Sequence, residues 1–161
     1  MTDASSYRFD RLKLGHIARD MFFTKNDPGP GDPVDFDLPL LGGGRIRTAD
    51  LAENGPALLV FGSYTCPVTA SAAPGLNDLH ARFGDDVRFV MVNVREAHPG
   101  VNVPQPSDID AKRESAERLR ELRNIPYEVA VDDIDGTLHR ALSPKPNSTY
   151  LLGTDGRIRF R

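Results

Sequence analysis

The residue with the clearest chemistry in this sequence is Cys66, its only cysteine. It follows the apolar run 58–62 and precedes a segment of helical composition, 70–83. A buried strand that turns directly into a helix would place the Cys66 sulfur at the helix N-terminus, where unpaired N–H groups and the helix dipole favour a thiolate. Pro67 suits the first turn of such a helix. This pattern predicts a nucleophilic thiolate, and the alternative is a small buried hydrophobe.

A histidine follows the next apolar run along the chain. Residues 87–94 are almost continuously apolar, which is typical of a central strand in a parallel sheet, and His98 comes soon after them. Because chemistry in open α/β sheets gathers at the carboxyl ends of the strands, we expect His98 and Cys66 at the same edge. The imidazole could pair with the thiolate or give a proton to a leaving group. Glu96 is the candidate to orient the His98 ring.

Three hydroxyl side chains flank the cysteine. Ser63 and Thr65 could donate hydrogen bonds to the sulfur or to a bound oxygen. Ser63-x-x-Cys66 also resembles the Thr/Ser-x-x-Cys motif of peroxiredoxins, although the proline that those enzymes carry earlier in the motif is absent. Thr69 occupies the position where a second, resolving cysteine would stand, so we expect an external thiol to regenerate Cys66.

Two longer motifs carry a family resemblance. Cys66-x-x-Thr69, followed by Pro74, resembles the active-site helix of thioredoxins. The string 61–67, Phe-Gly-Ser-Tyr-Thr-Cys-Pro, resembles the iodothyronine deiodinases, in which selenocysteine stands at the place of Cys66, and Glu-Ala-His-Pro at 96–99 resembles a second motif of those enzymes. This resemblance, which covers roughly residue 56 onward, implies a redoxin-type, thioredoxin-like domain with deiodinase-like ancestry.

The remaining patterns predict an α/β protein, and the resemblance implies that its fold is thioredoxin-like. A central mixed sheet flanked by helices would follow an N-terminal β-hairpin and an N-terminal helical extension, with the extension at 1–27 and the domain at 28–161. We expect Ser107 and Asp110 to cap a helix whose charged positions face solvent. The expected elements are an opening hairpin at 34–40 and 45–47, strands at 58–62, 87–94 and 128–131, helices at 70–83, 107–122 and around 138–142, and a terminal hairpin at 149–152 and 157–160.

The N-terminal segment has apolar residues at helical spacing, including Leu12, Ile17 and the run 21–23. A thioredoxin-like sheet normally carries a final helix after its terminal hairpin, whereas this sequence stops at Arg161. An uncovered sheet face would expose a large apolar patch. The segment around 17–23, a second copy of the chain, or a further segment outside this sequence could cover that face. We expect the segment around 17–23 to do so, together with a homodimer contact.

Composition excludes several classes of function. A net charge of −3 over 161 residues gives no basic field for nucleic acid. One cysteine excludes an internal disulfide framework and a zinc site built on several cysteines. The N-terminus lacks the apolar region of a signal peptide, and no run approaches the ~18 apolar residues of a membrane span. We expect a cytoplasmic protein without a nucleic-acid or membrane partner.

No metal or cofactor is expected. The carboxylates within 132–135 lack the spacing of a calcium-binding loop. His16, His80 and His139 follow no ligand spacing, so we expect them on the surface.

These observations favour a thiol oxidoreductase that acts on a small molecule. Cys66 would attack an electrophilic atom, namely iodine on an aromatic ring, a peroxide oxygen or a disulfide sulfur, and a small thiol or thioredoxin would restore it. The three chemistries correspond to a deiodinase-like dehalogenase, a one-cysteine peroxidase and a disulfide reductase. Docking of a disulfide is in doubt, because Asn147 stands where thioredoxins have a cis-proline and Pro146 falls one residue early. A hypothesis from another class is a binding module in which Cys66 is vestigial.

Overall fold

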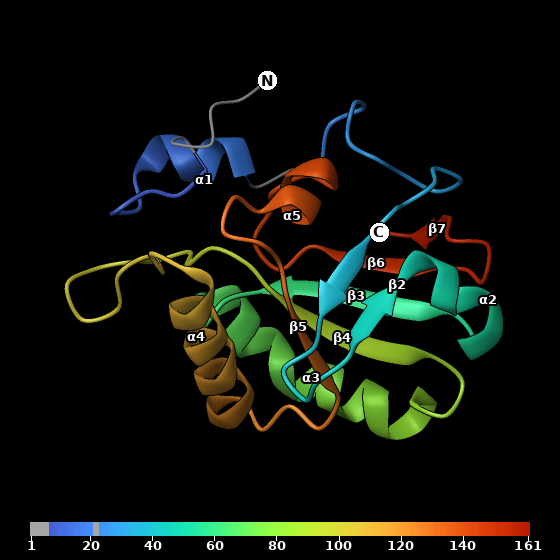
Figure 1. Ribbon diagram of the computed structural model, residues 1–161. Coiled ribbons are helices and arrows are strands. Elements are labelled where there is room, and N and C mark those ends of the chain that lie inside the picture. Colours follow the sequence, from blue (N-terminus) through green and yellow to red (C-terminus); the bar gives the residue numbers. More distant parts are fainter. Residues whose placement is uncertain (1–6, 21–22) are drawn as a thin grey trace.

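A five-stranded mixed sheet forms the centre of the protein, which we describe from a computed structural model for residues 7–20 and 23–161 (Figure 1). The strand order is β5-β4-β3-β6-β7. The first three pair in parallel, while β6 and β7 are antiparallel to their neighbours. This is the mixed sheet that the sequence predicts, with strands β3 (Ala57–Gly62), β4 (Arg88–Asn93), β5 (Glu128–Val131), β6 (Thr149–Leu152) and β7 (Ile158–Phe160).

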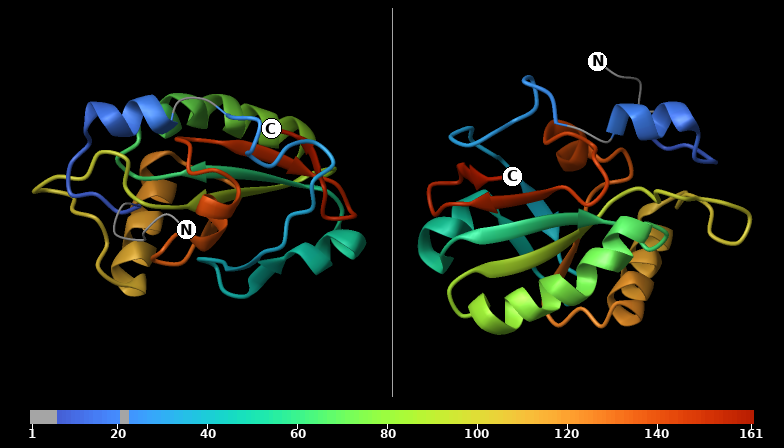
Figure 2. Two further views of the ribbon diagram at one scale, coloured as in Figure 1. Left: turned by 90° about the horizontal axis from the view of Figure 1, so that it is seen from above. Right: turned by 180° about the vertical axis from the view of Figure 1, so that it is seen from behind.

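Helices and a hairpin cover the two faces of this sheet (Figures 1 and 2). The crossovers from β3 to β4 and from β4 to β5 step in the same direction across the sheet, so right-handed connections place both of their helices on one face. These helices are α3 (Pro67–Phe83) and α4 (Ile109–Leu122). The opposite face carries the hairpin β1 (Asp37–Pro39) and β2 (Arg45–Arg47), the short η2 (Thr48–Asp50) and α2 (Leu51–Asn54), and α5 (Thr137–Ala141).

The two faces have separate apolar cores because side chains alternate along each strand. Leu59 and Phe61 of β3 pack with the hairpin and α5 side. Val60, between them, packs with Met91 and the residues of α3 and α4. All four of these side chains are fully buried. The nearly continuous apolar runs of the sequence are therefore central strands that are covered on both faces.

The cap and the buried face of α4 differ from the prediction. Asp108, rather than Ser107, caps the helix by accepting the Ala111 backbone N–H at 2.9 Å. Lys112, predicted to be solvated, is 2% exposed, and its ammonium donates to the Asp133 carbonyl at 2.6 Å. Burial lowers the pKa of Lys112 to about 8. Leu122, the last residue of α4, is half exposed.

The N-terminal helix α1 (Leu14–Asp20) lies near the sheet edge where α3 begins (Figures 1 and 2). The prediction that this segment covers the open sheet face is wrong for its described part, since Phe160 on β7 remains 62% exposed. Phe23 packs instead against the ring of Tyr150, which belongs to the core on the hairpin side. Met21 and Phe22 lie outside the described residues. No helix in the described parts of the chain is long and apolar enough to cross a membrane.

Candidate active site around Cys66

Cys66 is the N-cap residue of α3, where the sequence predicts it. Pro67 occupies the first helical turn, and the Cys66 carbonyl accepts the Ala70 N–H at 3.0 Å. The strand end before the turn is closely packed, since a Cβ on Gly62 would lie 2.8 Å from the Met91 sulfur. The cysteine is only 3% exposed and carries no disulfide. The strand-to-helix turn therefore presents one free thiol at the positive end of a helix of 17 residues.

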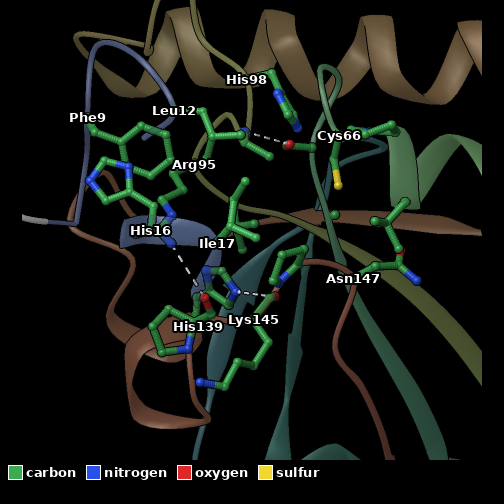
Figure 3. Close-up of a pocket in the computed structure, with 18 residues that line it drawn as sticks. Phe9, Leu12, His16, Ile17, Cys66, Arg95, His98, His139, Lys145 and Asn147 are labelled. Atoms are coloured by element: carbon green, nitrogen blue, oxygen red, sulfur yellow. Dashed lines mark hydrogen bonds between the residues drawn. The ribbon is translucent and has the colours of Figure 1, made fainter. Parts of the chain in front are cut away.

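The Cys66 side chain borders a pocket of about 270 Å³ (Figure 3). Its wall is mainly apolar and is built by four parts of the chain. The β3–α3 turn supplies Ser63 and Cys66, and the loop after β4 supplies Arg95 and His98. The chain from α5 to β6 supplies His139 and residues 144–147, and the N-terminal segment forms the opposite side. The full lining comprises Phe9, Leu12, His16, Ile17, Gly62, Ser63, Cys66, Pro67, Val68, Val94, Arg95, Ala97, His98, His139, Pro144, Lys145, Pro146 and Asn147.

Two predicted site residues share this pocket with the cysteine. The Ser63 hydroxyl accepts the Ala97 N–H at 3.2 Å, which leaves its own proton available to a ligand. His98 is exposed at the rim, and Figure 3 shows its ring on the same side of the pocket as Cys66. The structure therefore brings His98 and Cys66 to one edge of the sheet. No hydrogen bond joins the imidazole to the sulfur among the described contacts.

Glu96 does not orient the His98 ring, contrary to prediction. Its buried carboxylate accepts hydrogen bonds from the Thr65 N–H at 2.8 Å, from the Thr65 hydroxyl at 2.6 Å, and from the Ser115 hydroxyl of α4. The Thr65 hydroxyl also accepts the His98 N–H at 3.1 Å. Thr65 is thus committed to Glu96 rather than directed at the sulfur. Glu96 clamps the cysteine turn to the loop after β4 and to α4.

Thr69 lies behind the site rather than in it. Its side chain is fully buried against Gly62, and its hydroxyl accepts the Ser63 N–H at 3.4 Å. It is not among the residues that line the pocket. Thr69 therefore supports the turn that presents Cys66, and the position of a resolving cysteine is filled by a structural hydroxyl.

Asn147, which stands at the sequence position of the thioredoxin cis-proline, borders the same pocket. Its backbone has a φ of 51°, and the described peptide bonds are all trans. The chain therefore enters β6 beside Cys66 with an asparagine in the left-handed region, a conformation that asparagine tolerates better than most residues.

Arg95 is a site residue that the sequence did not reveal. It is 7% exposed and donates to the Tyr7 carbonyl at 2.6 Å and to the Pro144 carbonyl at 3.4 Å. Its guanidinium lies 4.6 Å from the ring centre of Tyr7 and 5.0 Å from that of Phe9. The hydrogen bond to Tyr7 joins residues 88 positions apart, and no local sequence pattern predicts it.

His139 is buried at the base of the site, so its predicted surface position is wrong. Its Nε2 faces the Lys145 carbonyl at 3.1 Å and must donate, because a carbonyl only accepts. Nδ1 therefore accepts from the Tyr7 hydroxyl at 2.8 Å. The ring stacks on Phe61 with centroids 5.2 Å apart. Burial lowers the pKa of His139 to about 3, so the imidazole is neutral and structural.

The acidic residues after β5 also have a structural role. The Asp132 carboxylate accepts backbone N–H groups from Asp133 at 2.9 Å, Leu138 at 3.3 Å and His139 at 2.9 Å. Burial raises the pKa of Asp132. This carboxylate organises the start of α5, and the described residues contain no cluster of metal-ligating side chains.

Comparison with known proteins supports this description of the fold. A model of the AhpC/TSA family matches residues 30–161. No curated protein sequence matches the chain. The structure resembles a secreted Mycobacterium tuberculosis disulfide oxidoreductase homologous to E. coli DsbE, at 22% identity and a TM-score of 0.57, covering 79% of this chain and 82% of that one.

Two further solved structures are similar. Peroxidoxin BcpB from Mycobacterium tuberculosis is 21% identical with a TM-score of 0.58, covering 81% of this chain and 82% of that one. The thioredoxin domain of a thiol-disulfide oxidoreductase from Bacteroides vulgatus is 12% identical with a TM-score of 0.63, covering 81% and 86%. At these identities the likeness establishes the thioredoxin-like fold.

Proposed function

We propose, from the premise that this chain belongs to the AhpC/TSA family and is therefore a redoxin-type thiol oxidoreductase, that Cys66 reduces a small-molecule electrophile and is regenerated by an external thiol. The supporting observation is the position of the thiol: it caps a long helix at the wall of a mainly apolar pocket, with no second cysteine in the chain. Such a site can enclose a small reactant and exclude bulk water from the reacting atoms.

The first candidate substrate is an organic hydroperoxide. The Cys66 thiolate attacks the terminal peroxide oxygen, the O–O bond breaks, and the alkoxide leaves with a proton as an alcohol, so that Cys66 becomes a sulfenic acid. One external thiol then forms a mixed disulfide with Cys66 and releases water. A second thiol releases reduced Cys66 and an external disulfide. Ser63 favours this chemistry because its hydroxyl proton is free to bond the peroxide at the pocket wall.

The second candidate is an iodinated aromatic compound, as in a deiodinase. The thiolate attacks iodine, the carbon–iodine bond breaks, and the carbanion takes a proton, leaving a sulfenyl iodide on Cys66. Two external thiols then return the cysteine and release iodide, a proton and a disulfide. One observation favours this candidate: the two deiodinase-like motifs contact each other directly, through Glu96 and Thr65.

Regeneration by an external thiol requires a reducing compartment, for which the cytoplasm is our proposal, with a small thiol or thioredoxin as the donor. A protein disulfide is a poorer substrate because the thiol is only 3% exposed. A homodimer also stays a proposal, and Phe160 and the half-exposed Val68, Leu79 and Phe83 of α3 are apolar surface that it could bury.

The test compares the wild-type protein with Cys66→Ser. In the presence of dithiothreitol, each is given cumene hydroperoxide or 4-iodophenol, and loss of substrate is followed. A dimedone trap with mass spectrometry identifies the sulfenic acid. We expect turnover of at least one substrate that Cys66→Ser abolishes, and a dimedone adduct on Cys66 only after the substrate that is turned over has been added. Absence of both turnover and adduct in the wild type would overturn the enzyme proposal in favour of a binding module.

A further inference from the structure

The N-terminal segment 7–17 forms one wall of the Cys66 pocket. Phe9, Leu12, His16 and Ile17 all line it, although they lie about fifty residues or more before the cysteine in sequence. Figure 3 shows Leu12 and Ile17 directed from this segment toward the side of the pocket on which Cys66 lies. We call this segment the roof, because it closes the cavity above the sheet edge.

Tyr7 anchors the first end of the roof. It is 3% exposed, and its hydroxyl donates to the buried His139. Its ring lies where a side chain on residue 136 would be: a Cβ on Gly136 would come within 2.2 Å of it. The Arg95 guanidinium then covers the rings of Tyr7 and Phe9 and donates to the Tyr7 carbonyl. These are contacts of a docked segment with a specific seat, and cation–π contacts are stronger when desolvated.

Gln105 ties the roof to the catalytic side of the pocket. Its carboxamide nitrogen donates to the Phe9 carbonyl at 3.2 Å and to the Glu96 carbonyl at 2.7 Å. Its oxygen accepts the Glu96 N–H at 2.9 Å. One side chain thus fixes the distance between Phe9 of the roof and the residue that clamps the cysteine turn. Phe9 is further held by stacking on His16, with ring centres 4.2 Å apart.

We propose that the roof is a built part of the substrate site, and that Leu12 and Ile17 select electrophiles with an apolar body and hold it while the reactive atom meets Cys66. This inference rests on the proposed function. The cavity, at about 270 Å³, is small for a ligand site and mainly apolar, so it suits a small organic molecule better than a peptide. Hydrogen peroxide would gain little from such walls, because it has no apolar surface to bury.

Arg95 acts in this account as a positioning residue. It does not face the ligand with a free charge, since its guanidinium is engaged by the Tyr7 and Pro144 carbonyls and by two aromatic rings. Its effect on selectivity passes through the roof. The sequence-matched family region begins at residue 30, so the roof lies outside it and belongs to this chain's own extension.

The experiment places one charge on the wall of the pocket and one away from the pocket, both on α1. Ile17 lines the pocket, while Leu14 is 85% exposed and does not. Ile17→Asp and the control Leu14→Asp are compared with the wild type for kcat/KM toward cumene hydroperoxide and hydrogen peroxide. We expect Ile17→Asp to lower the cumene-to-hydrogen-peroxide ratio by roughly tenfold, the effect of withholding about 1.4 kcal/mol of apolar contact, and Leu14→Asp to leave the ratio within about twofold. An unchanged ratio in Ile17→Asp, or equal changes in both variants, would overturn the inference.

A binding measurement separates this inference from the proposed chemistry. Cumyl alcohol is titrated into Cys66→Ser and into Cys66→Ser/Ile17→Asp, and shifts of backbone amide resonances around residues 63–66 and 95–98 are followed by NMR. Saturable shifts that weaken with Ile17→Asp support the roof as a binding wall even if the wild type reduces neither peroxide, in which case only the proposed function fails. Absence of shifts in Cys66→Ser overturns the inference whatever the activity.

Discussion

The two sides of the Cys66 pocket are held by different kinds of contact. The catalytic side, formed by the turn 63–66 and the loop 96–98, depends on a buried carboxylate that accepts three hydrogen bonds from two elements. The roof depends on aromatic rings, one guanidinium and one carboxamide. Because displacement of the turn or of the loop would leave the buried Glu96 carboxylate without its donors, this network opposes movement of the catalytic side. The roof can vary in side chain while the chemistry beneath it stays the same.

This difference separates reactivity from selectivity. The groups that present the sulfur lie on a turn and a loop that directly follow β3 and β4, and at the N-terminus of α3, so the central sheet and this helix position them. The groups that meet the body of a ligand lie on an extension outside the region that the AhpC/TSA family model matches. We therefore expect changes on the catalytic side to affect stability and all reactions together, and changes on the roof to affect substrates unequally.

The largest effect is expected for Glu96→Gln. The amide brings an N–H group to face hydroxyl and N–H donors and removes the charge from a fully buried network, so we expect a loss of about 3 kcal/mol of unfolding free energy. Urea denaturation measures it. Glu117→Gln on the exposed face of α4 is the matched control and should lie within about 0.5 kcal/mol of wild type. If the two variants were equally stable, the clamp would not hold the catalytic side.

The catalytic side is also the part that sequence reasoning located. An apolar run, a tight turn and a helical segment are local signals, and together they place Cys66 at the N-terminus of α3. The edge shared with His98 follows from the parallel pairing of β3 and β4. The predicted role of Glu96 was wrong because proximity in sequence suggested His98 as its partner, whereas the partners of its carboxylate lie 31 and 19 positions away along the chain. Its carboxylate turns inward to Thr65 and Ser115.

The roof could not be predicted in the same way. Tyr7 and His139 are 132 residues apart, and Gln105 and Phe9 are 96 apart, so no periodicity or spacing links them. The helical pattern around Leu12 and Ile17 revealed an amphipathic segment but not the surface that it meets. The positive charge of Lys112 also led to a wrong prediction of solvent exposure. Its ammonium is buried because it donates a hydrogen bond to the Asp133 carbonyl, a contact that local sequence does not predict.

The next effect concerns pH and the anchor of the roof. His139 has its usual pKa near 6.5 when unfolded and about 3 when folded, so below pH 6.5 the unfolded chain binds a proton that the native protein does not. Native stability should therefore be lost as the pH falls from 6.5 toward 3, by up to about 1.4 kcal/mol for each pH unit. Denaturation midpoints of wild type and His139→Gln across pH 4.5–8 give the difference. Parallel curves would show that His139 is not the titrating group.

A smaller effect is expected for Tyr7→Phe. The ring under Arg95 is kept, but the buried Nδ1 of His139 loses its hydrogen-bond donor, which costs about 1 kcal/mol. Limited proteolysis should then cut the N-terminal segment faster while the domain core stays resistant. Tyr64→Phe, on the catalytic side and half-buried, is the control with an unchanged cleavage pattern. Equal proteolysis of both variants would mean that the Tyr7 hydroxyl does not fasten the roof.

The smallest effect is expected for His98→Ala, and it tests where the catalytic side ends. The imidazole is exposed at the rim and makes no hydrogen bond to Cys66 among the described contacts, so its influence must be electrostatic or act on a bound substrate. Removing it should slow alkylation of Cys66 by iodoacetamide about threefold at pH 7, a change of roughly 0.6 kcal/mol in the barrier. Stability should stay unchanged, because the Thr65 hydroxyl accepts the backbone N–H of residue 98 and not its ring.

His16→Ala, on the roof side of the same pocket, is the matched control for loss of a histidine. If His98→Ala slowed peroxide turnover by a hundredfold while iodoacetamide was unaffected, the imidazole would be a proton donor to the leaving group. The catalytic side would then include His98 at the rim, and the substrate would lie between His98 and the roof.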